Sequence, residues 1–499
     1  MEIMFETVRC PYLTPALRET QTQEVTQEIR ISDGQTDINR VIGAWGQVIL
    51  RSKEWQGGSL TLTGGVMAWV LYTSGEEQGE QILEEWLPFR MKWELPEGTG
   101  EGTMRAQCLL RFADARNVSP RKLMVRCGVS VMLEAMTPAT AEIPRPVAGE
   151  KSLQLLKHSY PVLLPKEAGE KSFTIEEELT LSAPCPPDAK LLCCTLRPAV
   201  TEAKVVSDKV VFRGNGQAHC LYTGENGALH AQDFELPFSQ FVRLEGEYPA
   251  DAQADVILAV TNLEASFTEA GTLQLKCGLT GQYLVDERRI LEVVEDAYDL
   301  DRVLTQEQEE LTLPSVLETR EEPVTAEKDL PLDAEEILDC VFYPDFPESR
   351  KHEQGARILL TGQFQLLYRQ TDGSLQCAAA RWEETMDFPG DRENRLFARC
   401  LPGGTATAVR RDDGAALSAQ TGLCLRTLAG QGITVTTRIE LGEPIQRNPG
   451  RPSLILRRVG NNSLWSLAKA YGTTEAGICR ENPPEELQIP GRMLLIPIP

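Results

Sequence analysis

Basic residues and long apolar runs are scarce in this chain, and each scarcity excludes a class of partner. The 499 residues include 50 Lys and Arg against 73 Asp and Glu, a formal net charge of −23. Nucleic-acid phosphates and anionic membrane surfaces are both bound through Lys and Arg, so we expect neither as a partner. No run of eighteen apolar residues occurs, so we expect no membrane span. Residues 1–7 have no basic or apolar signal region, which predicts a protein that is not secreted.

Residue types that carry catalysis are also few. The chain has four histidines, at His158, His219, His230 and His352. None of them stands in a metal-binding spacing such as H-E-x-x-H. His219 and Cys220 are neighbours on a predicted strand, so their side chains face opposite ways and cannot pair as base and nucleophile. The sequence therefore predicts no catalytic residue, no metal, no cofactor and no enzymatic activity.

The cysteines form no recognisable framework. There are thirteen, an odd number, and they are scattered along the chain without a C-x-x-C pair. Several fall on apolar strand positions, where a free cysteine behaves as a small hydrophobic residue. We therefore expect a reducing compartment and no disulfide scaffold.

The C-terminal segment carries the most specific pattern in the chain. Residues 456–468 have the sequence LRRVGNNSLWSLA and residues 489–497 have the sequence IPGRMLLIP. Ser463 can cap a helix whose apolar face is Leu464, Leu467, Ala468 and Tyr471. Gly472 then stands where a left-handed residue ends a helix, and Thr474 can cap a second helix that runs to about Asn482. The pattern predicts a strand–helix–helix–strand unit over residues 453–499.

Internal repetition is the second strong feature of the sequence. The landmarks are, in order, Gly64 and Gly214, Tyr72 and Tyr222, the Leu-Pro-Phe triplets at 87–89 and 236–238, and the segments 122–128 and 272–278. Three of the four pairs are 150 residues apart, and the triplets are one residue out of step. A fainter third copy has Gly362, Tyr368 and Phe388 and closes with a strand from Ile433 to Leu441.

Each copy shows the alternation of a strand with one buried face. Leu123, Val125, Cys127, Val129 and Val131 alternate with polar or small residues, and the same pattern follows Leu273 and Ile433. Five to seven strands in roughly 110 residues predict a sandwich-like unit. The predicted domains are a first repeat at 1–140, a Pro-containing linker at 141–170, a second repeat at 171–291, an acidic linker at 292–336, a degenerate third repeat at 337–445 and the C-terminal unit at 453–499. Both linkers are interpreted as either flexible or lying as edge segments against the sheets. The acidic linker is interpreted as a solvated connector, with a docking surface for a basic partner as the alternative.

This plan of three β-rich repeats followed by one small α+β module resembles the SPOCS-domain/LysM family of spore coat morphogenetic proteins from Clostridia. The C-terminal motif resembles a LysM module, except that Asn461 and Asn462 stand where the family usually has Gly-Asp. The fold class implied is mainly β, with three sandwich-like SPOCS repeats and a βααβ LysM domain. The resemblance implies a non-enzymatic adaptor in the mother-cell cytoplasm that reaches the forespore surface and binds the coat morphogenetic ATPase or another coat protein.

The resemblance places a partner-binding groove on two loops of the LysM-like module. The predicted groove residues are Asn461, Asn462, Ser463, Leu464, Ile489, Pro490, Gly491 and Arg492. In LysM folds these loops lie side by side at one end. The alternative for Leu464 and Ile489 is that both are core residues of the small domain. Trp465 is interpreted as a core residue of the same domain. The alternative function is a cell-wall protein whose LysM module binds the N-acetylglucosamine backbone of peptidoglycan.

Overall fold

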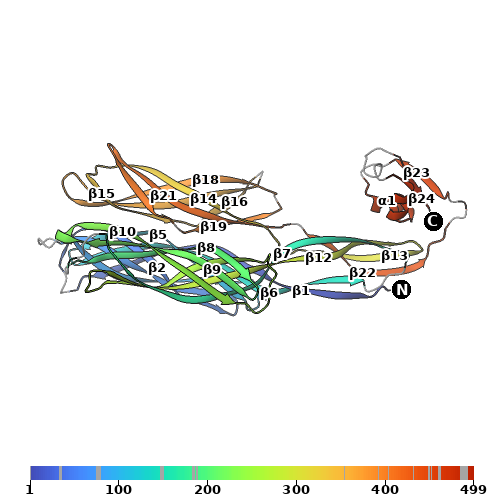
Figure 1. Ribbon diagram of the computed structural model, residues 1–499, viewed down its shortest axis with the longest axis horizontal. Coiled ribbons are helices and arrows are strands. Elements are labelled where there is room, and N and C mark those ends of the chain that lie inside the picture. Colours follow the sequence, from blue (N-terminus) through green and yellow to red (C-terminus); the bar gives the residue numbers. More distant parts are fainter. Residues whose placement is uncertain are drawn as a thin grey trace.

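The computed structural model describes residues 2–32, 36–74, 80–146, 151–182, 186, 189–352, 355–391, 393–402, 404–430, 432–447, 450, 452–458, 462–483 and 493–498. The molecule is mainly β, as predicted, and its described α-helices are two short ones near the C-terminus. Figure 1 shows a strand-rich body, an arm of long strands that extends from it, and a small C-terminal unit at the far end of the arm. No helix in the described part of the chain is long and apolar enough to cross a membrane.

The first repeat consists of two three-stranded antiparallel sheets, ordered β1-β6-β5 and β2-β3-β4. Its strands are β1 (Phe5–Arg30), β2 (Ile38–Gln56), β3 (Ser59–Ser74), β4 (Glu80–Glu94), β5 (Thr103–Ser119) and β6 (Lys122–Pro146). The apolar residues predicted to alternate along β6 are all buried, and they pack against the buried side chains of β3 and β4 in one core. Burial of one face of each sheet against the other is what holds such a pair together.

The second repeat has the same order of strands. Its sheets are β7-β12-β11 and β10-β9-β8. The strands are β7 (Leu153–Leu179), β8 (Leu191–Val206), β9 (Lys209–Thr223), β10 (Leu229–Arg243), β11 (Gln253–Phe267) and β12 (Leu273–Asp299), with a 3-10 turn at Glu225–Gly227. A core between the two sheets includes Phe212, Leu236 and Leu275.

The third repeat breaks its long strands into shorter ones. Its strands are β13 (Arg302–Leu311), β14 (Val316–Pro331), β15 (Glu336–Pro344), β16 (Glu348–His352), β17 (Gly355–Arg369), β18 (Leu375–Pro389), β19 (Arg395–Leu401), β20 (Ala406–Arg411), β21 (Gly414–Leu428) and β22 (Ile433–Pro444). β14, β19 and β20 all pair with β21, while β15, β16 and β18 pair with β17. β21 therefore takes the place that β6 and β12 hold in the other repeats. The segment from Ile433 to Leu441 was aligned with that strand in the sequence and instead lies in β22, outside the two packed sheets.

The glycine and Leu-Pro-Phe landmarks have a shared structural cause. Gly64 lies opposite Phe89 on the next strand, and Gly214 lies opposite Phe238. A Cβ added at Gly64 would come within 2.7 Å of the Phe89 ring, and one at Gly214 within 2.4 Å of the Phe238 ring. At Gly362 a phenylalanine ring from the other neighbouring strand closes over the backbone in the same way. Each glycine makes room for an aromatic ring that covers it, which stabilises the pairing of the strands.

The two segments predicted as linkers are paired strands. Residues 141–170 hold the end of β6 and much of β7, and residues 292–336 hold the end of β12 with β13 and β14. Prolines are tolerated there because β7 is an edge strand and the outer end of β6 pairs only with β1. In β13 and β14 the acidic side chains are mostly exposed, and they masked the alternation that indicates a strand.

These strands form the arm seen in Figure 1, here called the stem. It consists of the outer ends of the β1/β6 and β7/β12 pairs together with the β13/β22 pair. All three repeats contribute to its core, whose buried members are Cys10, Ala141, Ile143, Val162, Leu164, Leu291, Val293, Leu313, Ile433 and Val435. The stem therefore joins the three repeats through a shared apolar interior.

Buried glutamines also connect the repeats. Gln282 of the second repeat donates to Ala106 O and accepts from Ala106 N of the first, each at 2.8 Å. Gln47 of the first repeat accepts from Leu196 N of the second at 2.8 Å. Gln365 of the third repeat donates to Ala44 O of the first at 2.7 Å. Each amide satisfies backbone groups of another repeat, so sliding one repeat past its neighbour would leave buried polar groups unpaired.

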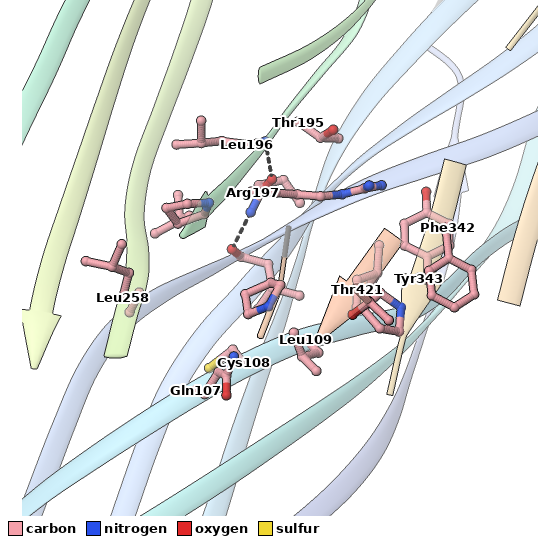
Figure 2. A pocket seen from close by; sticks show the side chains of 18 of the residues that line it. Gln107, Cys108, Leu109, Thr195, Leu196, Arg197, Leu258, Phe342, Tyr343 and Thr421 are labelled. Carbon is pink, nitrogen blue, oxygen red and sulfur yellow. Dashed lines mark hydrogen bonds between the residues drawn. The ribbon is translucent and has the colours of Figure 1, made fainter. Parts of the chain in front are cut away.

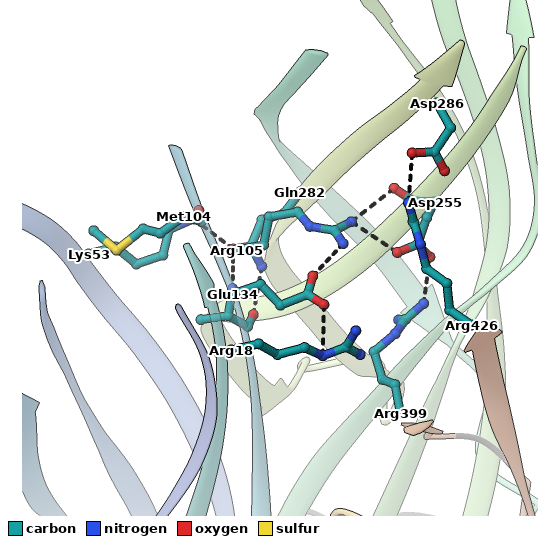
Figure 3. Close-up of polar contacts among 11 residues, drawn as sticks. Arg18, Lys53, Met104, Arg105, Glu134, Asp255, Gln282, Asp286, Arg399 and Arg426 are labelled. Carbon is teal, nitrogen blue, oxygen red and sulfur yellow. Dashed lines mark hydrogen bonds and ion pairs between the residues drawn. The ribbon is translucent and has the colours of Figure 1, made fainter. Parts of the chain in front are cut away.

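A charged network lies where the three repeats meet, and it is drawn in Figure 3. Arg105, Asp255 and Arg399 stand on β5, β11 and β19, the corresponding strands of the three repeats. Asp255 is 3.0 Å from Arg105 and 2.5 Å from Arg399, and Arg105 also pairs with Glu134 at 2.5 Å. The Arg105 side chain is 4% exposed, so these ions are desolvated and depend on one another.

The described cysteines are all free. Eleven of these twelve are buried or half-buried, and Cys479 is exposed. Cys127 and Cys277 lie in the apolar cores, where burial raises the pKa of each thiol to about 12. They act as small core residues in the way the sequence predicted.

Candidate functional site

The C-terminal unit has the predicted strand–helix–helix–strand order. β23 (Leu454–Arg458) pairs antiparallel with β24 (Met493–Pro497), and α1 (Leu464–Tyr471) and α2 (Glu475–Glu481) lie between them in the chain. Ser463 accepts a hydrogen bond from Ser466 N at 3.2 Å and caps α1. Gly472 ends α1 in the left-handed region, with φ of 64°. Thr474 accepts from Gly477 N at 2.9 Å and caps α2, so all three predicted helix boundaries are confirmed.

One asparagine joins the second helix to the last strand. Asn482 donates to Ile478 O and Leu495 O, each at 2.7 Å, and accepts from Leu495 N at 2.8 Å. Its side chain is buried, so these bonds are made away from water. Asn482 thereby gives hydrogen-bond partners to backbone groups of both α2 and β24.

The predicted groove is only partly within the described residues. Asn462 and Ser463 are exposed, and Leu464 is half-buried beside the core of the unit. Asn461, Ile489, Pro490, Gly491 and Arg492 lie outside the described residues. The groove as a whole remains a prediction, and Ser463 already uses its hydroxyl oxygen as a helix cap.

Trp465 does more than fill the core of the unit. Its ring packs against Tyr298 of β12 in the stem, with the ring centroids 4.8 Å apart, and its Nε1 donates to Asp296 Oδ2 at 2.7 Å. Lys469, one helical turn later, donates to both Asp296 oxygens, at 2.6 and 2.8 Å. The Tyr298 hydroxyl donates to Thr473 O at 2.7 Å. One face of α1 and the loop after it therefore dock on the stem, far from the unit in sequence.

Asp296 is the centre of this docking contact. Burial raises the pKa of the Asp296 carboxyl, but hydrogen bonds from Lys469, Trp465 and Gln306 outweigh burial, and the pKa falls below its usual value. The carboxylate therefore stays ionised near neutral pH, where its bonds to Lys469 and Trp465 are charge-assisted. No pattern in the sequence indicates Asp296, which lies in a segment interpreted as the start of the acidic linker.

A small cavity lies between the repeats and is shown in Figure 2. Its volume is about 100 Å³. It is lined from all three repeats, with Gln47 and Gln107 from the first, Arg197 from the second, and Tyr343 and Thr421 from the third. The cavity belongs to the junction of the repeats and not to the predicted groove.

The histidines have structural surroundings. His158 pairs with Glu295 on the stem surface, and His352 lies 3.3 Å from Arg357 on an exposed hairpin. His230 packs against the ring of Tyr222, and His219 lies between two aspartates. Among the described residues no three His, Cys, Asp or Glu side chains are placed to hold a metal ion.

Comparison with known families gives one finding. Residues 189–268 match the family model described as SipL, SPOCS domain. This segment is therefore similar to a SPOCS domain. The SPOCS segment covers β8 to β11, which is one complete sheet of the second repeat and the first strand that follows it. The predicted resemblance is thus confirmed for the repeat whose glycine and Leu-Pro-Phe landmarks are clearest. Neither the curated proteins nor the solved structures give a significant match.

Proposed function

We propose that this chain is a non-enzymatic adaptor of spore-envelope assembly. The observation that carries the proposal is the SPOCS segment at residues 189–268, which indicates a sporulation-related protein. The three repeats correspond to three SPOCS domains, of which the second carries the match. The C-terminal βααβ unit corresponds to a LysM module. The adaptor works in the cytoplasm of the mother cell, at the forespore surface, where it binds the coat morphogenetic ATPase or another coat protein.

The architecture suits a tether. The repeats are fixed to one another by buried amides and ion pairs, so the body can act as one rigid part. The LysM-like unit lies at the end of the stem, away from the packed sheets (Figure 1). A partner held by this unit would therefore be kept apart from one held by the repeats, which is how an adaptor joins two structures.

The partner site of the LysM-like unit is the predicted groove. In this proposal the exposed Asn462 and the half-buried Leu464 contact the partner from one loop, with Asn461 and Ser463 beside them. Ile489, Pro490, Gly491 and Arg492 contact it from the other. The docking of Trp465 and Lys469 on the stem leaves Asn462 exposed.

A pull-down with the full chain tests the proposal. The immobilised protein is expected to retain a coat morphogenetic ATPase from the same kind of spore former. Asn462→Lys, a change at an exposed position, and Leu464→Asp should both weaken retention. Ala470→Asp, on an exposed position of α1, serves as the matched control and should leave retention unchanged. Circular dichroism and amide exchange check that each variant is folded.

The second candidate function is glycan binding, and the LysM-like sequence at residues 456–497 favours it. In this case the chain should sediment with insoluble peptidoglycan, and Leu464→Asp should release it. Sedimentation with peptidoglycan together with no retention of any coat protein would replace the adaptor proposal by this one.

A further inference from the structure

The interface of the second and third repeats contains four ionisable side chains in one place. These are Arg197 on β8, His219 on β9, Asp233 on β10 and Asp339 on β15. His219 Nδ1 lies 2.8 Å from Asp233 Oδ1, and Nε2 lies 3.1 Å from Asp339 Oδ1. The side chains of His219 and Asp339 are 13% and 3% exposed, whereas that of Asp233 is 40% exposed. The cluster is therefore anchored inside the protein and reaches solvent at Asp233.

The first repeat shows that the fold does not need these charges. The positions that correspond to Arg197, His219 and Asp233 are Gln47, Trp69 and Glu84, by the same strand register. There the Trp69 indole donates to Glu84 at 2.8 Å, which keeps the cross-strand contact without a buried cation. Removing an imidazolium and part of a guanidinium from water costs free energy that the first repeat avoids. Departures of this kind from an otherwise repeated pattern are expected at functional sites.

A cavity of about 290 Å³ adjoins the cluster. Its polar lining consists of Arg197, Gln217, His219, Gln232, Asp233, Asp339, Thr405 and Thr407. No Phe, Tyr or Trp is among the described residues that line it, so it lacks the aromatic platform on which a sugar ring would stack. Groups of both charges line a space that is large enough for a compact polar molecule.

Arg197 is the member of the cluster with unused hydrogen-bonding capacity. A guanidinium carries five N–H donors. Within the described part of the chain Arg197 makes one hydrogen bond, from Nη1 to Gly404 O, at 3.5 Å. Burial lowers the pKa of Arg197, and the nearby Tyr343, Asp233 and Asp339 offset this only in part. Figure 2 shows the Arg197 side chain extending toward Tyr343. Arg197 lines both the small central cavity and this larger one.

We propose that the larger cavity binds a free α-amino acid in its zwitterionic form. The ligand carboxylate pairs with the Arg197 guanidinium, the side chain best suited to bind a carboxylate through two parallel bonds. The ligand ammonium pairs with the Asp233 carboxylate, and the side chain of the ligand lies toward Thr405 and Thr407. The two cations and two anions of the cluster already balance in charge. A zwitterion adds no net charge to them, whereas a simple carboxylate would add a negative charge beside two aspartates.

Calorimetric titration of the full chain tests this site. The probes are the free α-amino acids one at a time, acetate and methylammonium as the two halves of the ligand, and glucose as an uncharged polyol. At least one amino acid is expected to bind with a Kd of about 1 mM or tighter, and each half should bind at least about tenfold more weakly. Absence of binding by every amino acid at about 10 mM would overturn the proposal, as would acetate or glucose binding as tightly as the best amino acid.

Two variants and a control assign the site to its residues. Arg197→Gln restores the residue that the first repeat has at this position, and Asp233→Asn keeps the shape of the side chain. Each should weaken amino-acid binding at least about tenfold. Arg213→Gln removes an exposed arginine on the same sheet and should leave the affinity unchanged. If Arg197→Gln does not fold, Asp233→Asn and the wild-type titration decide. Unchanged affinity in a folded Arg197→Gln or Asp233→Asn protein would show that the amino acid binds elsewhere and would reject the proposed site.

The amino-acid site goes beyond the adaptor proposal and is independent of it. Loss of binding in Arg197→Gln leaves the groove of the C-terminal unit intact, so retention of a coat protein in the pull-down should persist. Failure of one proposal is thereby distinguishable from failure of the other.

Discussion

Single polar side chains fix the C-terminal unit in two different ways. Asn482 holds the unit together internally, since it bonds to both α2 and β24. Asp296 holds the unit to the stem, since it accepts from Trp465 and Lys469. The first should control the folding of the unit, and the second should control its position. The two substitutions below separate these roles.

Asn482→Ala is expected to destabilise the C-terminal unit without affecting the repeats. The change removes three hydrogen bonds and leaves the buried Ile478 carbonyl and the half-buried Leu495 backbone groups without their partner. A buried unsatisfied group costs about 1–3 kcal/mol. Amide exchange should therefore speed up in α2 and β24 while exchange in β1–β22 stays the same. Asn462→Ala, at an exposed asparagine in the same unit, should change neither.

Asp296→Asn is expected to release the unit from the stem while leaving it folded. The amide keeps the shape of the carboxylate but loses the ion pair with Lys469 and the charge-assisted bond from Trp465. The docking free energy should fall by about 1–3 kcal/mol, toward the low end because Lys469 is partly exposed. Amide exchange around Tyr298 and Thr473 reports the loss.

The same contact gives a pH dependence with a defined sign. The pKa of Asp296 is lowered in the folded protein, so its contribution is present above its ordinary value near 3.8 and is lost as the pH falls through the lowered value. Wild-type docking should therefore weaken in acid, and Asp296→Asn should show no such change. Glu292→Gln, an exposed position on the same strand, is the control. Equal protection of the docked face in wild type and Asp296→Asn at neutral pH would contradict the assigned role.

Individual elements in this protein are held in register by what lies opposite them. The glycines at 64 and 214 face Phe89 and Phe238, and His219 on β9 lies between Asp233 on β10 and Asp339 on β15. The glycine contacts and the His219–Asp233 contact lie within a sheet, whereas the His219–Asp339 contact crosses from the second repeat to the third. Contacts across repeats are therefore where ionisation can change how elements pack.

We expect the contact between β9 and β15 to weaken at high pH, because His219 then loses the positive charge that faces Asp339. Burial lowers the pKa of His219, but Asp339 and Asp233 outweigh burial and raise it to about 10. Because the folded pKa is raised, the stabilisation is fully present below the ordinary value of 6.5 and is lost as the pH rises toward 10. Arg197 is the other charged group that faces the cluster, and it stays protonated throughout this range.

Unfolding measured in denaturant at pH 6 and at pH 9.5 checks the prediction. The wild type should lose stability over this range, by at least about 1.5 kcal/mol, because the charge-assisted contacts of His219 with Asp233 and Asp339 end. His219→Gln should be less stable at pH 6 and should show a flatter dependence on pH. His158→Gln, which changes an exposed histidine paired with Glu295 on the stem, should behave as wild type does. A wild-type protein that is equally stable at both values would reject the role of His219.

Features of the fold and the candidate site could be predicted from the sequence where they depend on residues close together in the chain, and not where they depend on residues far apart. The caps at Ser463 and Thr474 and the left-handed Gly472 were predictable because each involves residues three or four positions apart. The mainly β class followed from alternation around residues such as Cys127 and Cys277. The stem was missed because its strands carry exposed acids on one face and proline at their edges. The contact of Trp465 with Asp296 joins residues 169 positions apart, and no short-range pattern indicates it.

At the scale of the whole molecule, the three repeats are joined at one charged centre. Asp255 lies between Arg105 and Arg399, so each repeat supplies one of these three ions. Burial raises the pKa of the Asp255 carboxyl, but Arg399 and Arg105 outweigh burial and hold it well below its ordinary value. The aspartate is therefore ionised near neutral pH, where it balances the charge of Arg399 and shares the charge of Arg105 with Glu134.

Asp255→Asn is the substitution that should act on all three repeats together. It leaves Arg399 without the carboxylate it contacts at 2.5 Å, and it leaves Arg105 with Glu134 alone. Breaking a buried pair from one side costs about 3–5 kcal/mol, because the remaining charge stays buried. Denaturant unfolding followed by circular dichroism should show this loss as a shift of the midpoint. Asp251→Asn changes an exposed aspartate of the second repeat that pairs with Arg288. It should lower the free energy of unfolding by less than about 0.5 kcal/mol. If the repeats depend on the shared centre, Asp255→Asn should also increase amide exchange in β5 and β19, which belong to other repeats. Exchange that rises only in β11 and its neighbours would mean that the ions stabilise the second repeat alone and do not hold the three together.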